Sequence, residues 1–379
     1  YDVWVGGVQI TSEKLSIEGD SGTATYDPVT NTLKLNGFSY SGAGALIKGR
    51  NYAAIGTTAT ELNIVLAGAN SITCSGDNGN GIYATNNINI SGSRADSLTI
   101  SSGSTGIYTS GGKLSVKNTE VKIAAAGRNG FDVKGFTADN AVIDMVGVDN
   151  IGVYSADVNT SICNKSQVKI SADYKAVYAY NSHITVSGES SLVVEGELYR
   201  YNSNFVIENS TLTCANLTID GAGDIAITDS QVTCAYLETD ELTVTENSVL
   251  TCGDIVAWED VIITASEVNA AGSITAQTLD ADWNWIPTNI IITDASVTIA
   301  GDEYGITANT QIAGNSTVTV QGANAFNAKP TLNGTFTVYA GTADNHPLAD
   351  ANADETYANK YVKIEPVKYD LWVGGGQGT

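Results

Sequence analysis

Proline, methionine, arginine and histidine are all scarce in this sequence, and each shortage narrows what the chain can be. Among 379 residues there are five Pro, one Met and two His. No long segment spaces its apolar residues as an amphipathic helix does, so a helical fold is not expected. No run of about 18 apolar residues occurs, so we expect no membrane insertion.

Positive charge is also in short supply, because 18 Lys and Arg face 41 Asp and Glu and leave a net charge of −23. Phosphate contacts need clustered basic residues, so we expect no nucleic-acid partner. The acidic side chains keep a long β-protein soluble and discourage pairing between sheet edges. A second interpretation is that some carboxylates bind calcium, which prefers oxygen ligands.

What the sequence does contain is Val, Ile, Thr, Ser and Asn in quantity, together with 39 Gly, a mixture that favours short strands and tight turns. One pattern recurs, in which Ser or Thr precedes an alternating pair of apolar residues, as in Ile207–Cys214 and Ile227–Cys234. Successive copies are separated by 20, 20, 18 and 18 residues and centre on Ser190, Ser210, Ser230, Ser248 and Ser266. Further copies centre on Thr119, Ser166, Ser296, Ser316 and Thr335.

A second, independent repeat places an aromatic residue directly after an apolar one. Segments such as Gly81-Ile-Tyr-Ala and Gly152-Val-Tyr-Ser recur at steps of 21 to 25 residues. Because the apolar residue points inward, its neighbour points outward. The resulting outward column consists of Tyr83, Tyr108, Asp132, Tyr154, Tyr178 and Tyr199.

These periods predict an all-β chain, a single-stranded right-handed parallel β-helix in which three sheets form a solenoid of about 12–13 rungs. We assign residues 1–60 to N-terminal cap strands, 61–340 to the β-helix and 341–368 to a C-terminal cap. The step of 30 residues from Ser266 to Ser296 predicts that one rung carries an extra loop. Tyr1–Thr11 nearly repeats at 369–379, so we interpret 369–379 as the start of a truncated second module and expect a monomer within a larger multi-module chain.

The Ser- and Thr-anchored rungs resemble the pectin-lyase-like right-handed β-helix superfamily. The opening Tyr1–Thr11 and the segment Tyr26–Gly37 resemble repeated cell-surface modules of gut Firmicutes. The resemblance implies a bacterial, extracellular or cell-surface location. It does not choose between polysaccharide lyases, hydrolases, adhesins and calcium-dependent pectin-binding modules, because one fold carries many functions.

The catalytic motifs of enzymes with this fold are missing. The chain has no Asp-Asp pair, no Gly-His-Gly and no Arg-x-Lys, and its two histidines, His183 and His346, stand apart. Two carboxylates at a suitable separation would still support hydrolysis, but sequence does not give that separation. We therefore favour a noncatalytic module and keep a polysaccharide lyase or hydrolase as the less favoured alternative.

Four of the five cysteines share a column with Ile, Val and Ala. Cys74, Cys214, Cys234 and Cys252 are therefore predicted to be small buried core residues rather than metal ligands or disulfide partners.

The tyrosine column is the best candidate for a binding surface, because aromatic faces beside polar groups suit sugar rings. The alternative is a structural ladder in which the rings stack on each other. Asp132, which interrupts the column, and its sequence neighbours Asp139 and Asp144 are candidate calcium ligands, and a solvated acidic face is the alternative.

The second candidate is the predicted loop around Trp283 and Trp285, which either covers a rung edge or forms a ligand platform. Taken together, the sequence predicts a surface module that binds a polysaccharide or a host or cell-surface glycan, with calcium as the one cofactor considered. A structural stalk or adhesin spacer is the other reading.

Overall fold

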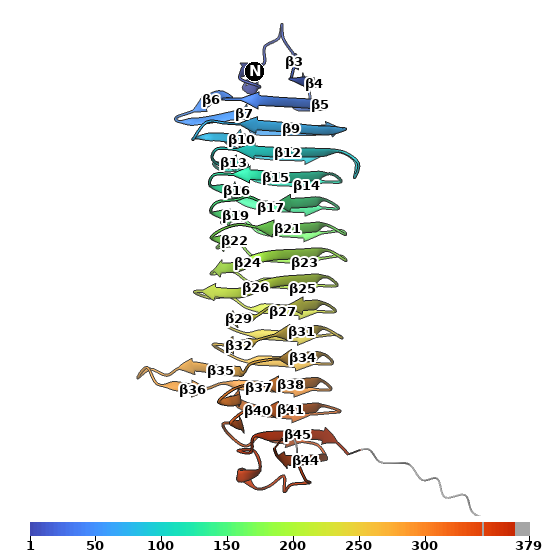
Figure 1. Cartoon of the computed structure of the whole chain (residues 1–379), viewed down its shortest axis with the longest axis vertical. Coiled ribbons are helices and arrows are strands. Elements are labelled where there is room, and N and C mark those ends of the chain that lie inside the picture. Colours follow the sequence, from blue (N-terminus) through green and yellow to red (C-terminus); the bar gives the residue numbers. More distant parts are fainter. Residues whose placement is uncertain (343–344, 368–379) are drawn as a thin grey trace, which may run out of the picture. The chain divides into compact units, whose positions relative to one another are not determined.

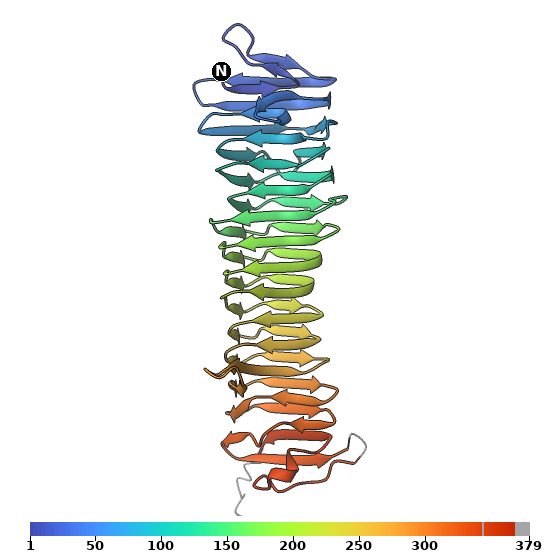
Figure 2. The same cartoon turned by 90° about the vertical axis from the view of Figure 1, so that its left-hand side faces the viewer.

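The computed structural model describes residues 1–342 and 345–367. It confirms a parallel β-solenoid of about 12 turns, with 64% of the residues in strands and 1% in helix (Figure 1, Figure 2). The segment 369–379, interpreted above as a second module, lies outside the described residues. Within the described part, no helix is long and apolar enough to cross a membrane.

The chain divides into two compact units: the first comprises Tyr1–Thr243 and Asn247–Cys252, and the second comprises Val244–Glu246 and Gly253–Thr379. Strand β30 (Leu242–Thr245) has residues in both. Each unit is built from three parallel sheets, and a strand pairs with its counterpart one turn later.

In the first unit, the three sheets are as follows. Sheet 1 consists of β7 (Asn51–Thr57), β10 (Gly79–Ala84), β13 (Ile107–Thr109), β16 (Asn129–Val133), β19 (Ile151–Ala156), β22 (Lys175–Tyr180), the second halves of β24 (Ser191–Tyr201) and β26 (Thr211–Asp220), and β29 (Tyr236–Thr239). Sheet 2 consists of the first half of β5 (Thr32–Gly42), β8 (Glu61–Ala67), β11 (Asn87–Ser91), β14 (Lys113–Lys117), β17 (Gly135–Asp139), β20 (Thr160–Cys163), β23 (Ile184–Ser187), β25 (Phe205–Glu208) and β27 (Ile225–Thr228). Sheet 3 consists of the second half of β5, β9 (Ala69–Cys74), β12 (Ser97–Ser102), β15 (Glu120–Ala126), β18 (Val142–Met145), β21 (Gln167–Ser171), the first halves of β24 and β26, β28 (Gln231–Thr233) and β31 (Val249–Cys252).

The N-terminal strands pair differently, because they are antiparallel. The hairpin of β1 (Val3–Val5) and β2 (Val8–Gln9) pairs with β7, and β6 (Ala45–Lys48) pairs with β7 as well. Strands β3 (Ser16–Glu18), β4 (Ser21–Asp27) and β5 form a meander. Strand β5 then pairs in parallel with β8 and β9, so the parallel ladders already begin within residues 1–60.

The second unit repeats the three-sheet plan. Its first sheet contains β32 (Asp254–Ala257), β35 (Ile274–Leu279), β39 (Tyr304–Thr307) and β42 (Asn324–Phe326). Its second contains β33 (Val261–Thr264), β37 (Asn289–Thr293), β40 (Asn309–Ala313) and β43 (Thr331–Asn333). Its third contains β34 (Glu267–Ala270), β38 (Ser296–Ala300) and β41 (Thr317–Gln321), and it ends with antiparallel β45 (Tyr361–Pro366) and β44 (Phe336–Gly341). A single 3₁₀ turn, η1 (Asp354–Thr356), precedes β45.

The recurring Ser column forms a hydrogen-bonded ladder inside the first unit. The backbone N–H of Ser190 donates to the hydroxyl of Ser210 at 3.1 Å, and the N–H of Ser210 donates to Ser230 at 3.1 Å. The same bond joins Ser166 to Ser190 at 3.2 Å and Ser230 to Ser248 at 3.2 Å. A small hydroxyl residue recurs there because it satisfies a buried backbone donor that no strand partner reaches.

Two expected members of that column do not occupy it. Ser296 is exposed, and the neighbouring Ala295 takes the buried slot and donates its N–H to Ser316 at 3.4 Å. Thr335 is exposed as well. The one-residue slip moves Ser296 to the outer face, because side chains along a strand alternate between its two faces.

The four cysteines predicted to be core residues are buried, at 0 to 6% exposure, and none forms a disulfide. Cys234 and Cys252 stack in consecutive turns with their Sγ atoms 3.2 Å apart. They behave as small apolar residues, as expected from the column that they share with Ile and Val.

Candidate ligand-binding surfaces

The residues of the tyrosine column are aligned on successive strands of sheet 1 in the first unit. Tyr83 pairs with Tyr108, Tyr108 with Asp132, and Asp132 with Tyr154. Tyr154 pairs in turn with Tyr178 and Tyr178 with Tyr199. The sequence repeat therefore predicted both the alignment of these residues and their common outward direction.

The two ends of the column differ in how much ring surface they present. Tyr83 is only 2% exposed, and its ring packs against Tyr108 with centroids 5.5 Å apart. Tyr154, Tyr178 and Tyr199 are half-buried and meet edge to face, at 5.4 and 5.0 Å. Tyr83 is thus a packed structural residue, whereas the later tyrosines keep part of each ring in solvent.

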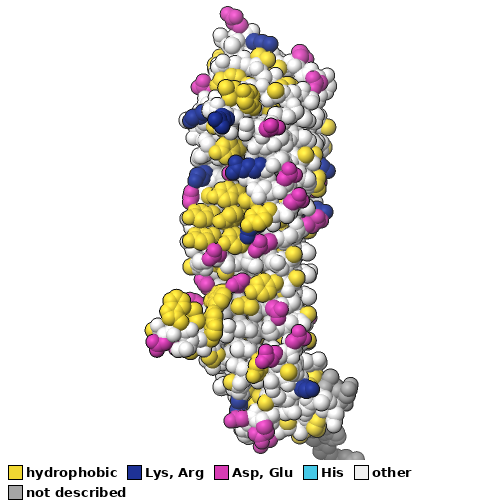
Figure 3. All heavy atoms as spheres, turned by 60° about the vertical axis from the view of Figure 1, so that its left-hand side comes forward, with side chains coloured by type: hydrophobic (Ala, Val, Ile, Leu, Met, Phe, Trp, Pro, Cys, Tyr) yellow, Lys and Arg dark blue, Asp and Glu magenta, His cyan; other side chains and the backbone are white. Residues whose placement is uncertain are grey.

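Three further tyrosines extend this exposed part of the column. Tyr180 and Tyr201 stack face to face, with centroids 5.0 Å apart and planes inclined by 6°. Tyr174, in the turn before β22, is 65% exposed. We call Tyr154, Tyr174, Tyr178, Tyr180, Tyr199 and Tyr201 the tyrosine platform. Figure 3 shows hydrophobic side chains gathered at mid-height on this face of the molecule.

Polar groups lie among the platform rings. The ammonium of Lys175 is 3.4 Å from the centre of the Tyr199 ring and 2.9 Å from the carboxylate of Glu197. Glu197 also accepts a hydrogen bond of 2.7 Å from Thr218. The Tyr199 hydroxyl donates to Asp220 at 2.9 Å. The platform thus combines aromatic surface with a fixed cation, two carboxylates and a hydroxyl.

Burial shifts the acidity of the column. Desolvation raises the pKa of Tyr108, Tyr154, Tyr178 and Tyr199, and in Tyr199 the hydrogen bond to Asp220 raises the pKa further. Burial also raises the pKa of Asp132, against a lowering by the 3.0 Å hydrogen bond from Asn129. These phenols therefore stay neutral hydrogen-bonding groups at physiological pH.

The three aspartates proposed as calcium ligands do not come together. Asp132, Asp139 and Asp144 lie on β16, β17 and β18, which belong to three different sheets of one turn. Asp139 forms an ion pair of 2.8 Å with Lys117, and Asp144 one of 3.1 Å with Lys122. No group of three carboxylate, His or Cys side chains suited to a metal occurs among the described residues. Proximity in the sequence did not predict proximity in space, because each corner carries the chain from one sheet into the next.

The extra residues after Ser266, which the long step predicted as a loop, form a hairpin. Strand β36 (Trp285–Pro287) runs antiparallel to the end of β35, with Leu279 opposite Trp285. Trp283 at the tip is 81% exposed, and Trp285 is 52% exposed. Trp285 packs against Trp258, which precedes β33, with ring centroids 5.3 Å apart and planes inclined by 32°. We call Trp258, Trp283 and Trp285 the tryptophan hairpin site.

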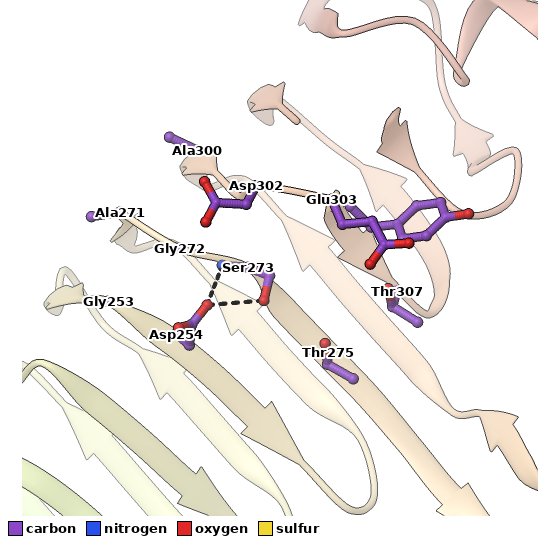
Figure 4. A pocket seen from close by; sticks show the side chains of 11 residues that line it. Gly253, Asp254, Ala271, Gly272, Ser273, Thr275, Ala300, Asp302, Glu303 and Thr307 are labelled. Atoms are coloured by element: carbon purple, nitrogen blue, oxygen red, sulfur yellow. Dashed lines mark hydrogen bonds between the residues drawn. The ribbon is translucent and has the colours of Figure 1, made fainter. Parts of the chain in front are cut away.

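A hollow of about 510 Å³ also lies in the second unit and is lined by Asp254, Ser273, Asp302, Glu303 and Tyr304 (Figure 4). The Asp254 carboxylate accepts bonds of 2.7 and 3.0 Å from the N–H and hydroxyl of Ser273. The hollow therefore presents mainly carboxylates to solvent, and it has no aromatic face apart from Tyr304.

Sequence reasoning missed four aromatic members of these surfaces. The signal for Tyr180 and Tyr201 was present, because each stands two residues after a column tyrosine and so faces the same side. Tyr174 lies in a turn and Trp258 at a strand end, where no repeat marks them. Their positions became clear only from the fold.

Comparison of the chain with protein-family models, with curated proteins and with solved structures finds no match.

Proposed function

We propose that this chain is a noncatalytic extracellular module, displayed on a bacterial cell surface, that binds polysaccharide on the tyrosine platform. The observation that carries the proposal is the gathering of six tyrosines from three consecutive turns around Lys175, Glu197 and Asp220. Aromatic rings pack on the C–H faces of sugars, while fixed polar groups orient the hydroxyls.

The repeat of the solenoid suits a polymer. Neighbouring strands lie about 4.8 Å apart, so equivalent tyrosines offer regularly spaced contacts along the direction in which the turns stack. An extended glycan chain lying across the turns would meet Tyr154, Tyr178 and Tyr199 in order, with Tyr174 and Tyr180 beside them. A ligand of this kind is held by several weak contacts rather than by one deep pocket.

Calcium has no part in the mechanism that we propose. The carboxylates near the platform are engaged, since Glu197 pairs with Lys175 and Asp220 accepts from Tyr199. The resemblance to the pectin-lyase-like superfamily and to Firmicutes surface modules, which the motifs suggested, agrees with a glycan ligand and a place in a longer chain. We infer that the module acts as a monomer within that chain.

A glycan array with the purified chain tests the proposal. We expect binding to at least one family of glycans to be reduced at least about tenfold by Tyr174→Ala and by Tyr180→Ala, because each removes an exposed aromatic contact. Tyr52→Ala is the matched control, since Tyr52 is 40% exposed but lies on β7, outside the platform. Equal loss in the control, or the absence of any glycan whose binding falls in both platform variants, would refute the assignment.

A structural stalk is the second candidate, and the buried contact of Tyr83 with Tyr108 favours it, because part of the column serves packing alone. A spacer would bind nothing across a broad glycan panel. Assays for unsaturated uronate products and for new reducing ends distinguish a lyase or hydrolase from a binding module and from a stalk. We expect both assays to be negative.

A further inference from the structure

The tryptophan hairpin site lies in a part of the sequence that contains no positive charge. Residues 253–328 contain nine Asp and Glu and not one Lys, Arg or His. The tyrosine platform, in contrast, has Lys175 at its centre. The two aromatic surfaces therefore differ in charge, because the platform contains an ammonium paired with a carboxylate, whereas residues 253–328 contain carboxylates and no cation.

Local contacts hold the hairpin tip in one shape. The Asp280 carboxylate accepts the N–H of Asp282 at 2.8 Å and that of Asn284 at 2.9 Å. Trp283 adopts a φ of 64°, a left-handed conformation that bulky residues rarely take. The turn thus holds Trp283 at the hairpin tip, where its side chain is 81% exposed.

The base of the hairpin is also fixed. Thr288 donates from its hydroxyl to the carbonyl of Glu259 at 2.5 Å, and the Asn289 N–H donates to the Asp260 carboxylate at 2.9 Å. These bonds hold the hairpin beside Trp258, so the Trp258 and Trp285 rings pack against each other at a tilt of 32°. The exposed part of Trp285 leaves an aromatic face that suits the face of a sugar ring.

Carboxylates are adjacent to the indoles along the chain. Asp282 is exposed next to Trp283, Glu259 is exposed and follows Trp258, and Asp260 lies at the hairpin base. The negative faces of indole rings attract cations, most strongly of all aromatic side chains. Nearby carboxylates add to that attraction and repel anions.

We infer that the tryptophan hairpin site binds a polysaccharide of amino sugars whose amines are free and protonated. The sugar ring would stack on Trp285 or Trp283, and its ammonium would lie between an indole face and the Asp282 carboxylate. The inference rests on the proposed polysaccharide-binding function, but not on the tyrosine platform. It disfavours polyuronates as ligands of this site, because their carboxylates would enter a field of like charge.

Tryptophan fluorescence provides a direct readout, because three of the five tryptophans of the chain belong to the site. The full chain is titrated with four probes of equal length: a glucosamine oligomer, its fully N-acetylated form, oligogalacturonate and oligolysine. We expect the glucosamine oligomer to bind at least about tenfold more tightly than the N-acetylated form, since acetylation removes the charge. Oligogalacturonate should not bind.

Variants localise the effect. Trp285→Ala and Trp283→Ala should each weaken glucosamine-oligomer binding about tenfold, and Asp282→Asn a few-fold. The controls are Leu348→Ala, which removes an equally exposed apolar residue of the same unit, and Glu267→Gln, which neutralises an exposed carboxylate away from the hairpin. Calorimetric titration accompanies the Trp variants, so that losing a fluorophore is not mistaken for losing binding.

Each contrary outcome overturns the inference in a different way. If the N-acetylated oligomer binds as tightly as the glucosamine oligomer, the site does not recognise the charge. If oligolysine binds as tightly, the site does not recognise the sugar ring. Binding that survives both Trp variants would place it elsewhere. The variants Tyr174→Ala and Tyr180→Ala separate the two claims. If they weaken binding of an array glycan but leave glucosamine-oligomer binding intact, both sites are supported. If the glucosamine oligomer binds at the hairpin but no glycan depends on the platform, only the platform assignment is overturned.

Discussion

At the scale of single residues, one buried charged side chain stands out, that of Arg200. Arg200 is fully buried between Tyr199 and Tyr201 of the platform strand. Its guanidinium donates to the backbone carbonyls of Ser203, Asp224 and Glu238 at 3.0, 3.2 and 3.2 Å. Burial lowers the pKa of Arg200 to about 10, which still leaves it charged at neutral pH.

Arg200→Ala should therefore destabilise the chain strongly, by about 3 kcal/mol or more, because it opens a cavity and removes three hydrogen bonds to backbone carbonyls. Urea unfolding of the variant measures the loss. Arg50→Ala, at an exposed position, should change stability by less than about 0.5 kcal/mol. Similar effects for both variants would contradict the assigned role of Arg200.

The buried phenols give a pH dependence with a definite sign. Burial raises the pKa of Tyr108, Tyr154, Tyr178 and Tyr199 in the folded chain above the unfolded value of about 10. The stability linked to these groups is complete below about pH 10 and is lost as pH rises toward the folded pKa values, because the unfolded chain then releases protons first. Urea unfolding below and above about pH 10, together with phenolate absorbance, measures this loss of stability. A free energy of unfolding that increases with pH above about pH 10 would contradict the prediction.

At the scale of elements, the Ser ladder explains why Ser recurs in one column of the first unit. Ser210→Ala removes the hydroxyl that accepts the buried N–H of Ser190. We expect a cost of about 1–3 kcal/mol in unfolding free energy. Ser187→Ala, at a half-buried position on β23, serves as the control and should cost far less. An equal cost for the two would mean that the ladder contributes nothing beyond side-chain packing.

The same scale shows what sequence could predict and what it could not. Two repeats predicted the strands, the inward cysteines and the alignment of the tyrosines, because a period of two fixes which face each side chain takes. One long step predicted extra residues after Ser266 as a loop, but not that they form a hairpin. The one-residue slip at Ser296 was not predicted. Moving one residue from a strand to a corner leaves the pattern of apolar residues nearly unchanged.

At the scale of the whole molecule, the sequence could not group surface residues that come from different turns and corners. Asp132, Asp139 and Asp144 look clustered along the chain but face three directions, whereas Tyr174 and Tyr201 are distant in sequence and belong to one platform. In a solenoid, residues that are close in sequence lie on different sheets on either side of a corner, whereas residues one turn apart lie side by side. Binding sites therefore form from residues separated in sequence by about one turn.

Metal dependence is the prediction that belongs to this scale. Because no suitable group of ligands occurs among the described residues, calcium and EDTA should leave both the melting temperature and glycan binding unchanged. Thermal unfolding and the array, each run with calcium and with EDTA, measure this. A clear stabilisation by calcium would require a site other than the three aspartates considered first.

The most direct test of the central claim is a crystal structure of the chain soaked with an oligosaccharide whose array binding is weakened by Tyr174→Ala and Tyr180→Ala. We predict sugar rings over the tyrosine platform, in contact with Tyr174 and Tyr180 and hydrogen-bonded near Lys175. Ligand bound only away from the platform, or an empty platform at saturating ligand concentration, would contradict the account.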